Sequence, residues 1–137
     1  MEYRFVEDKT IYVVGLYPSP ETDETNMDFM WWTYLALSWT YGCNVVLAKS
    51  PQEVPNLHAL PYIAVEQKTH QSTALKDFIH PPAAVYLVGN SKWSHPSYWA
   101  KADMAIHLDV PYVEHPLYGC QAAAIVLNDR YIQNASI

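Results

Sequence analysis

Three short turns near the end of the chain carry the residues best suited to holding a ligand. The first follows an apolar run and contains Gly89, which has no Cβ and so lets a ligand approach the main chain closely. The second follows another apolar run, and the third opens a stretch rich in small residues. Two neighbouring strands that end in turns, with a helix start beside them, expose backbone amides and carbonyls that can hold a polar ligand edge. The residues that we assign to this cradle are Leu87, Val88, Gly89, Asn90, Leu108, Val110, Pro111, Leu117, Tyr118 and Gly119.

Other arrangements of reactive side chains are weaker. His95, His107 and His115 lie near the three turns, but no pair has the spacing typical of metal ligands, so we expect hydrogen-bonded or surface histidines and no metal. Cys43 and Cys120 have no CxxC spacing, and reduced cysteines in a cytoplasmic protein are the simplest account. The sequence contains no serine nucleophile elbow, cysteine–histidine pairing or phosphate-binding loop.

Alternating strands and helices predict a single α/β domain over residues 1–137, with a mostly parallel sheet flanked by helices. We expect strands at residues 11–16, 43–48, 62–65, 83–88 and 105–110. We expect a helix from near Met27 that Gly42 ends, a helical turn at 73–78, a short helix in the polar loop after Gly89, and a final helix over 118–127. The first of these helices is apolar on many sides, so it must be covered by more than a single sheet.

Composition and charge restrict the classes of function. Half of the residues are hydrophobic and 14% are aromatic, which is typical of a folded domain with a real core. No apolar run reaches the about 18 residues of a membrane span, and the first residues do not resemble a signal peptide, so we expect a cytoplasmic protein. Eight basic and fourteen acidic residues give a net charge of −6. Nucleic-acid binders usually display a basic face, so the charge argues against RNA and favours a protein partner with a basic surface.

The order and spacing of the three turns resemble the SPOUT class of RNA methyltransferases, the knotted enzymes that bind S-adenosylmethionine, and among them the small tRNA 2′-O-methyltransferases. That family has a strand ending in Gly-x-Glu before a Leu-Pro, a strand ending in Ile-Pro-Met, and Ser-Leu/Met-Asn opening a helix rich in Ala and Val. The matching blocks here are Val88-Gly89-Asn90-Ser91 with His95-Pro96, Leu108-Asp109-Val110, and Pro116-Leu117-Tyr118 followed by residues 121–127. The resemblance covers the last third of the chain well. On residue types alone the same segments are ordinary core strands, and the matched spacing is what favours a cofactor site.

This resemblance implies a C-terminal trefoil knot, S-adenosylmethionine as cofactor, and methyl transfer to RNA at a ribose 2′-hydroxyl. It also implies a homodimer that packs through the first and last helices, where Gly119 and the alanines 122–124 would let another helix come close. The chain departs from the family pattern at Ser91, Ser94 and Asp109. It departs again at Tyr118, which either stacks on the adenine or fills the pocket.

The family's catalytic arginine is the most important departure. Family enzymes carry an Arg in the first helix, after an Asn-x-Gly turn, that helps to activate the ribose hydroxyl. Asn26 resembles that Asn, but residues 27–41 contain no Arg or Lys, and neither Arg4 nor Arg130 falls on the motif. The catalytic residue is therefore unassigned. Two alternatives stay open at this point, a non-catalytic SPOUT-like dimer that acts as a binding or scaffold protein, and an unrelated nucleotide-binding α/β protein.

Overall fold

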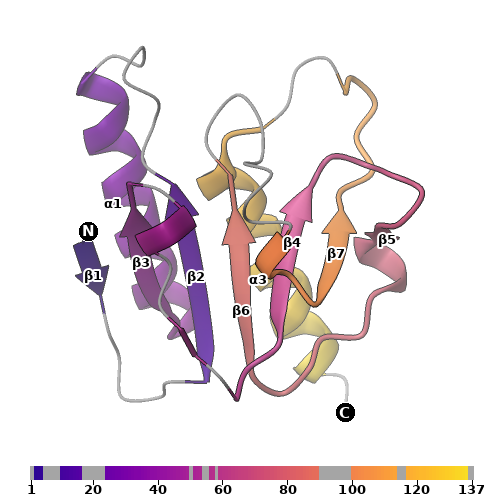
Figure 1. Ribbon diagram of the computed structural model, residues 1–137. Helices are drawn as coiled ribbons and strands as arrows, with labels where there is room; N and C mark the ends of the chain where they lie inside the picture. The colour runs from indigo at the N-terminus through magenta and orange to yellow at the C-terminus, as the bar shows by residue number, and fades with distance from the viewer. Residues whose placement is uncertain are drawn as a thin grey trace.

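A computed structural model shows one seven-stranded sheet with two long helices (Figure 1). The structure describes residues 2–4, 10–16, 24–49, 51–53, 56–57, 59–89, 100–113 and 117–135. In chain order the elements are β1 (Glu2–Arg4), β2 (Ile11–Leu16), α1 (Glu24–Tyr41), β3 (Asn44–Ala48), the 3-10 helix η1 (Pro51–Glu53), β4 (Tyr62–Glu66), β5 (Thr73–Ala74), the 3-10 helix η2 (Leu75–Asp77), β6 (Ala84–Val88), β7 (Met104–His107) and α3 (Gly119–Ala135).

The sheet has the strand order β1-β3-β2-β6-β4-β7-β5. Only β1 runs antiparallel to its neighbour, and the other strands pair in parallel. The predicted mostly parallel α/β fold is therefore confirmed. Because the carboxyl ends of parallel strands lie at one edge, β6 and β7, which have β4 between them, both end toward the upper edge of Figure 1. Helix α3 begins against Gly89, just after β6.

Both long helices cover the same face of the sheet, behind it in Figure 1. Strand residues at alternate positions point toward these helices, as the period of a strand requires. This larger core includes Val13, Val45, Ile63, Tyr86 and Val88 from the sheet, Tyr34 and Leu37 from α1, and Cys120, Ala123 and Val126 from α3. The opposite face carries a second buried cluster of Tyr12, Val14, Leu16, Val46, Ala48, Val85 and Leu87, against which Leu57, Leu60, Tyr62 and Ala102 pack.

Gly42 ends α1 as predicted. Its φ of +68° is in the left-handed region that favours glycine, and its N–H donates to the Ser38 carbonyl over 2.9 Å. The start of the helix differs from the prediction, because α1 begins at Glu24, three residues before Met27. Asp23, a residue type preferred at helix N-caps, immediately precedes Glu24 in the sequence and is a signal for that earlier start.

Strand pairing explains the remaining differences from the predicted elements. The predicted strand over 105–110 stops at His107, because β4 ends at Glu66, the residue paired with His107, and offers no partner beyond it. The segment predicted as a helical turn begins with the two-residue strand β5 beside β7 and continues as η2. Strand β1, which was not predicted, gains its conformation by pairing with β3.

Two sequence-based expectations fall on residues outside the described ranges. The short helix expected in the polar loop after Gly89 lies almost entirely in 90–99, and the loops that would form the knot include 90–99 and 114–116. The trefoil knot therefore stays a prediction. Within the described ranges, every helix is too short or too polar to cross a membrane.

Candidate ligand-binding site

The first and third predicted turns are in direct contact. Gly89 follows β6 and is buried, and Gly119 is the first residue of α3. A Cβ added to Gly119 would overlap the carbonyl oxygen of Gly89 and lie 3.3 Å from the hydroxyl of Tyr34. Only glycine lets the start of the helix rest directly on the main chain at the end of β6.

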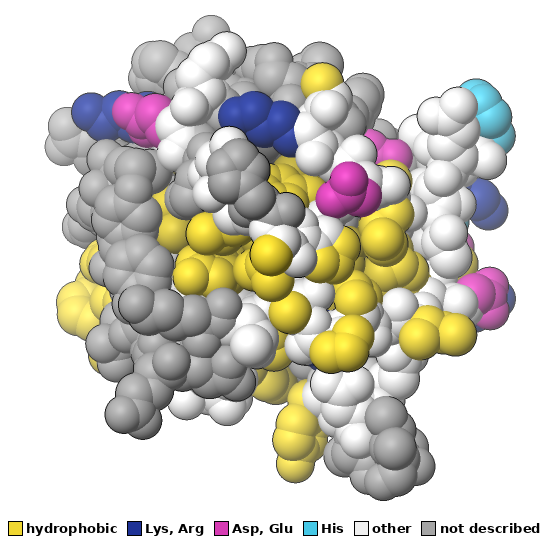
Figure 2. Space-filling view, turned by 60° about the horizontal axis from the view of Figure 1, so that its bottom comes forward, with side chains coloured by type: hydrophobic (Ala, Val, Ile, Leu, Met, Phe, Trp, Pro, Cys, Tyr) yellow, Lys and Arg dark blue, Asp and Glu magenta, His cyan; other side chains and the backbone are white. Residues whose placement is uncertain are grey.

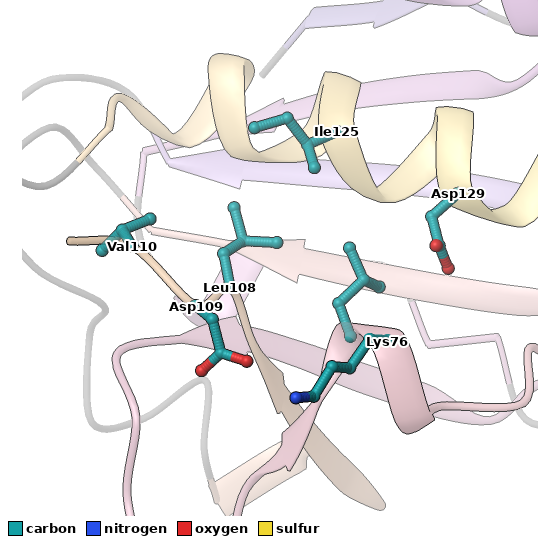
Figure 3. A pocket seen from close by; sticks show the side chains of 7 residues that line it. Lys76, Leu108, Asp109, Val110, Ile125 and Asp129 are labelled. Atoms are coloured by element: carbon teal, nitrogen blue, oxygen red, sulfur yellow. The ribbon is translucent and has the colours of Figure 1, made fainter.

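The second turn borders a hollow of about 300 Å³ beside α3. Residues Leu108–Val110, which follow β7, form one side of it. Figure 3 shows Ile125 and Asp129 projecting from α3 toward Leu108, with Lys76 below. The full lining is Leu75, Lys76, Leu108, Asp109, Val110, Ile125 and Asp129. Its apolar surface and its size are those of a small-ligand site at the lower end of the usual range.

The other predicted site residues are spread around this edge. Leu87 and Val88 are fully buried on opposite faces of the sheet, in the second and the larger core cluster respectively. Pro111 and Leu117 are exposed. Asn90 lies outside the described residues.

Tyr118 belongs to the surface between α1 and α3 and does not line the hollow. Its ring meets that of Phe29 edge-on, with 6.2 Å between the ring centroids. Its N–H donates to the Gln121 side chain over 2.9 Å, and its carbonyl accepts from the Ala122 N–H over 3.0 Å. Tyr118 therefore uses its main chain to cap α3.

His107 closes the carboxyl end of β7 and is almost fully buried. Its Nδ1 lies 2.8 Å from the Ser72 hydroxyl, and its Nε2 lies 3.4 Å from the Asp109 carboxylate. Glu66 is its neighbour in register on β4, and burial raises the pKa of that carboxyl.

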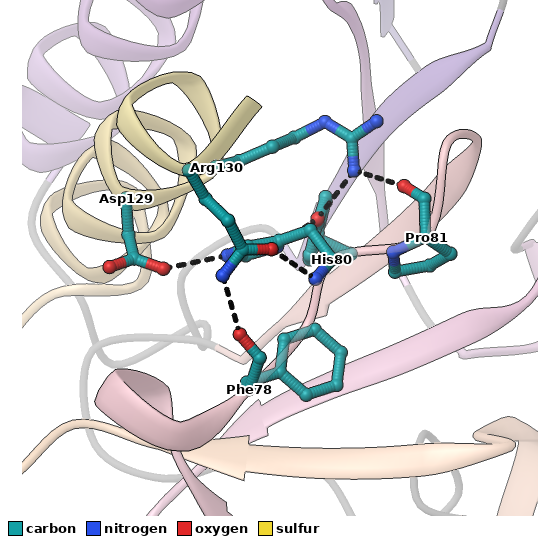
Figure 4. Close-up of polar contacts among 7 residues, drawn as sticks. Phe78, His80, Pro81, Asp129 and Arg130 are labelled. Atoms are coloured by element: carbon teal, nitrogen blue, oxygen red, sulfur yellow. Dashed lines mark hydrogen bonds and ion pairs between the residues drawn. The ribbon is translucent and has the colours of Figure 1, made fainter. Parts of the chain in front are cut away.

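A directed chain of hydrogen bonds joins α3 to the amino end of β6 (Figure 4). The Asp129 carboxylate can only accept, so the His80 Nε2–H donates to it over 2.8 Å. His80 Nδ1 is then an acceptor in the neutral ring, so the Tyr86 hydroxyl donates to it over 2.6 Å. The Arg130 guanidinium in turn donates to the Tyr86 oxygen over 3.1 Å. Burial lowers the pKa of His80 and outweighs the Asp129 carboxylate, which raises it, so the ring is neutral as this chain requires.

Arg130 cannot reach a substrate at the carboxyl edge. It is 3% exposed, and its guanidinium donates to the carbonyls of Pro81 and Pro82 over 2.6 Å each. These prolines precede β6, whereas Gly89 follows it. Among the described side chains of α1, residues 29–41, none is Arg or Lys. The described part of the chain thus offers no arginine in the catalytic position of the family.

Two other chemistries find little support in the described residues. Cys43 and Cys120 are buried, and burial raises the pKa of both thiols, that of Cys43 to about 12, so neither is a reactive thiolate near neutral pH. No three His, Cys, Asp or Glu side chains within the described ranges lie close enough to hold a metal ion.

Solved structures share this fold. No protein-family model matches the sequence, and no curated protein is similar to it. The A. aeolicus TrmH/SpoU tRNA-modifying enzyme superposes with a TM-score of 0.68 at 15% identity, over 94% of this chain and 77% of that one. The SpoU methyltransferase AviRb from Streptomyces viridochromogenes gives 0.67 at 18% identity, over 96% of this chain and 62% of that one. A TrmH-family protein from Porphyromonas gingivalis gives 0.64 at 11% identity, over 89% of this chain and 59% of that one.

These similarities define the class of fold. The chain has the SPOUT fold of the TrmH/SpoU proteins, and the resemblance seen in its last third extends over nearly all of its length. The chain spans about three fifths of the length of the AviRb and Porphyromonas gingivalis chains. At these identities the similarity establishes the fold alone.

The described residues fit an adenosyl group in their chemistry. Leu108 and Val110 are half-buried apolar side chains that follow β7, and Leu117 is exposed just before α3. A flat aromatic group needs such walls, together with main-chain donors and acceptors at its edge. The Tyr118 N–H already donates to the Gln121 side chain, and its carbonyl accepts one hydrogen bond from the Ala122 N–H.

Proposed function

We propose that this protein is an RNA methyltransferase of the SPOUT class that binds S-adenosylmethionine and methylates a ribose 2′-hydroxyl. The observation that carries the proposal is the contact of Gly89 with Gly119 at the carboxyl edge of the sheet, in a chain with the TrmH/SpoU fold. Ligands of open α/β sheets bind at the carboxyl ends of the strands, which is where these residues lie.

In this proposal Leu108, Val110 and Leu117 hold the adenosyl group, and the glycine main chain at 89 bounds its edge. When bound, S-adenosylmethionine supplies a methyl group activated by the positive sulfonium. The protein's part is to orient the acceptor oxygen and to exclude water. None of the described α1 side chains, residues 29–41, is an Arg or Lys, so the residue that removes the acceptor proton stays unassigned.

Charge distribution bears on the RNA half of the proposal. Figure 2 views the end of the molecule at which the parallel strands begin, and apolar side chains cover much of its middle. The described lysine and arginine side chains in that view lie apart from one another and form no continuous basic patch. Phosphate contacts from this face would therefore contribute little to RNA binding.

Calorimetry with S-adenosylhomocysteine and S-adenosylmethionine tests the cofactor. We expect both to bind the wild-type protein, and Val110→Arg to weaken binding about tenfold or more, because a charged chain would enter the apolar wall. Ile79→Arg is the matched control, since Ile79 is 83% exposed and lies outside the hollow. Absence of binding by both ligands at millimolar concentration would remove the cofactor from the proposal.

Methyl transfer from labelled S-adenosylmethionine to total RNA tests the reaction. Label recovered in RNA, and resistant to alkaline cleavage at the modified nucleotide, is the expected result for a ribose 2′-O-methyl group. Cofactor binding without any transfer would replace the enzyme with the non-catalytic binding protein that the missing arginine otherwise suggests.

We also propose that the protein is a homodimer that packs through the outer face of α1 and α3. Phe29, Trp32 and Trp39 are 49%, 62% and 60% exposed and recur at helical spacing on one side of α1, and Tyr131 on α3 is 64% exposed. Burying such a surface is favourable at about 25 cal/mol per Å² of apolar area. The small residues of α3 do not serve this purpose as predicted, because Gly119 rests on Gly89 and Ala123 is buried in the chain's own core.

A protein partner with a basic surface, and a cytoplasmic location, stay predictions from composition. The net charge of −6 is the only observation that supports such a partner.

A further inference from the structure

The hollow beside α3 has a charge distribution that the proposed methyltransferase function does not explain. Four apolar side chains line it, Leu75, Leu108, Val110 and Ile125, together with two carboxylates and one ammonium. In Figure 3 the Lys76 side chain points to the same side as Asp109. Asp129 lies at the other side, below α3 and in line with Ile125.

Asp129 presents its carboxylate at this hollow. Its one described partner is His80, whose side chain is fully buried and donates a single N–H to one carboxylate oxygen. Because the His80 ring is neutral in the hydrogen-bonded chain, it orients the carboxylate without neutralising it. The positive charge of the chain sits at its far end, on the buried Arg130. The Asp129 carboxylate is 34% exposed, so its charge is available to a ligand.

A second carboxylate of this hollow also lies near a buried histidine, but without a hydrogen bond to it. Asp109 lies 3.4 Å from Nε2 of His107, whose side chain is 4% exposed. That Nε2 atom is buried and makes no hydrogen bond within the described part of the chain. Two carboxylates, of which Asp129 is hydrogen-bonded to a buried histidine, thus line one apolar hollow together with a single ammonium.

We propose that this hollow binds an organic cation that carries a short apolar chain, an alkyl guanidinium or alkyl ammonium. The alkyl part would lie on Leu75, Leu108 and Ile125, and the cation would pair with Asp129. Charge-assisted hydrogen bonds to an oriented carboxylate are among the strong ones in proteins, and the partly buried setting limits screening by salt. The same chemistry is present in a free amine and in the ammonium end of S-adenosylmethionine, which would reach the hollow past Leu108 and Val110.

Methyl NMR on the full chain, with N-butylguanidinium as probe, tests the proposal. We expect saturable shifts of the methyl groups of Leu75, Leu108 and Ile125. N-butylurea has the same shape without the charge, and it should leave these methyl groups unchanged at equal concentration.

Two carboxylate-to-amide variants locate the cation. Asp129→Asn should weaken binding of N-butylguanidinium about tenfold or more, while an Asn side chain can still accept from the His80 N–H and preserve the fold. Asp77→Asn is the matched control, because this substitution also removes one negative charge next to Lys76 in the sequence. Asp77 is exposed and does not line the hollow. The proposal is overturned if the probe causes no shifts, if N-butylurea causes equal ones, or if Asp129→Asn binds as tightly as the wild type.

Saturation with S-adenosylhomocysteine distinguishes the two sources of the cation. Binding of N-butylguanidinium that persists identifies a site for a separate amine, and its displacement identifies the hollow as the place of the cofactor's ammonium end. Both results require that the hollow binds cations. Calorimetry reads cofactor binding independently, so failure of the methyltransferase proposal would not be mistaken for failure of this one.

Discussion

Gly119 is the residue on which the geometry of the candidate site depends most directly. Replacing a glycine by alanine inside a helix ordinarily stabilises it by up to about 1 kcal/mol. At Gly119 the added methyl group would overlap the Gly89 carbonyl oxygen, and overpacking of this kind costs roughly 1 to 3 kcal/mol. We therefore expect Gly119→Ala to lower the free energy of unfolding in urea, and to weaken S-adenosylhomocysteine binding, because the start of α3 must move away from β6.

Gly42→Ala is the control for that experiment. Gly42 has a positive φ but nothing within 4 Å of an added Cβ, so alanine there would strain the backbone without moving the site. It should lower stability and leave the affinity for S-adenosylhomocysteine unchanged. Equal loss of affinity in both variants would contradict the role of the Gly89–Gly119 contact.

His80 gives the protein a predictable loss of stability in mild acid. Burial lowers its pKa in the folded state below the ordinary value of 6.5, so below that pH the unfolded chain takes up the proton more readily than the folded one. Stability contributed by the neutral ring is therefore present above about pH 6.5 and is lost as the pH falls toward the folded-state pKa. Unfolding free energies measured between about pH 7.5 and 5.5 should fall in the wild type, and less steeply in His80→Gln.

His70→Gln serves as the comparison, because His70 is exposed. This variant should keep the wild-type dependence of stability on pH. A pH dependence that is the same in all three proteins would show that His80 is not the group responsible.

Helix α3 extends eight residues beyond its predicted end because of contacts that are distant in sequence. The Gln133 side chain accepts from the His80 N–H over 2.7 Å and donates to the Phe78 carbonyl over 2.8 Å. The Arg130 guanidinium donates hydrogen bonds to the carbonyls of Pro81 and Pro82, which follow His80 in the sequence. The second half of α3 is thus attached to the segment that enters β6.

Gln133→Ala should loosen that attachment. Removing both hydrogen bonds leaves a partly buried N–H and carbonyl unpaired, at a cost of roughly 1 to 3 kcal/mol. Hydrogen exchange should become faster at the amides of residues 130–135 and stay unchanged at the start of α3. Asn134→Ala, an exposed neighbour in the same turn, should have no such effect. If Gln133→Ala does not speed exchange at residues 130–135 relative to the start of α3, the two Gln133 hydrogen bonds do not hold this end of the helix.

The pattern of strands was largely predictable from local sequence. Runs such as Ile11–Leu16 and Asn44–Ala48 are buried on both faces of the sheet, and such strands are nearly continuous in Val, Ile and Leu. The two-residue strand β5 and the three-residue strand β1 could not be predicted from the sequence. Their conformation comes from pairing with β7 and β3, and they are too short to show an alternation of apolar and polar residues.

At the scale of the whole molecule, the exposed apolar side chains of α1 and α3 predict that the protein is a dimer. If α1 and α3 form the dimer interface, Trp32→Glu should place a charge in it and shift the protein toward monomer in sedimentation equilibrium at micromolar concentration. Ile79→Glu adds the same charge at a more exposed apolar residue outside both helices and should leave the assembly unchanged. A wild-type protein that is monomeric at high micromolar concentration would refute the proposed interface.

The amino-acid sequence by itself determined the α/β class, the carboxyl-edge turns and the resemblance to SPOUT proteins, because strand composition and glycine positions are local properties. Only the tertiary structure decided that Gly119 rests on Gly89, that Tyr118 packs against Phe29, and that Arg130 is buried at the amino end of β6. The same holds for the pairing of Asp129 with His80, 49 residues apart in sequence. Such contacts join residues that are far apart along the chain, and side-chain direction across a sheet or around a helix fixes them only once the elements are packed.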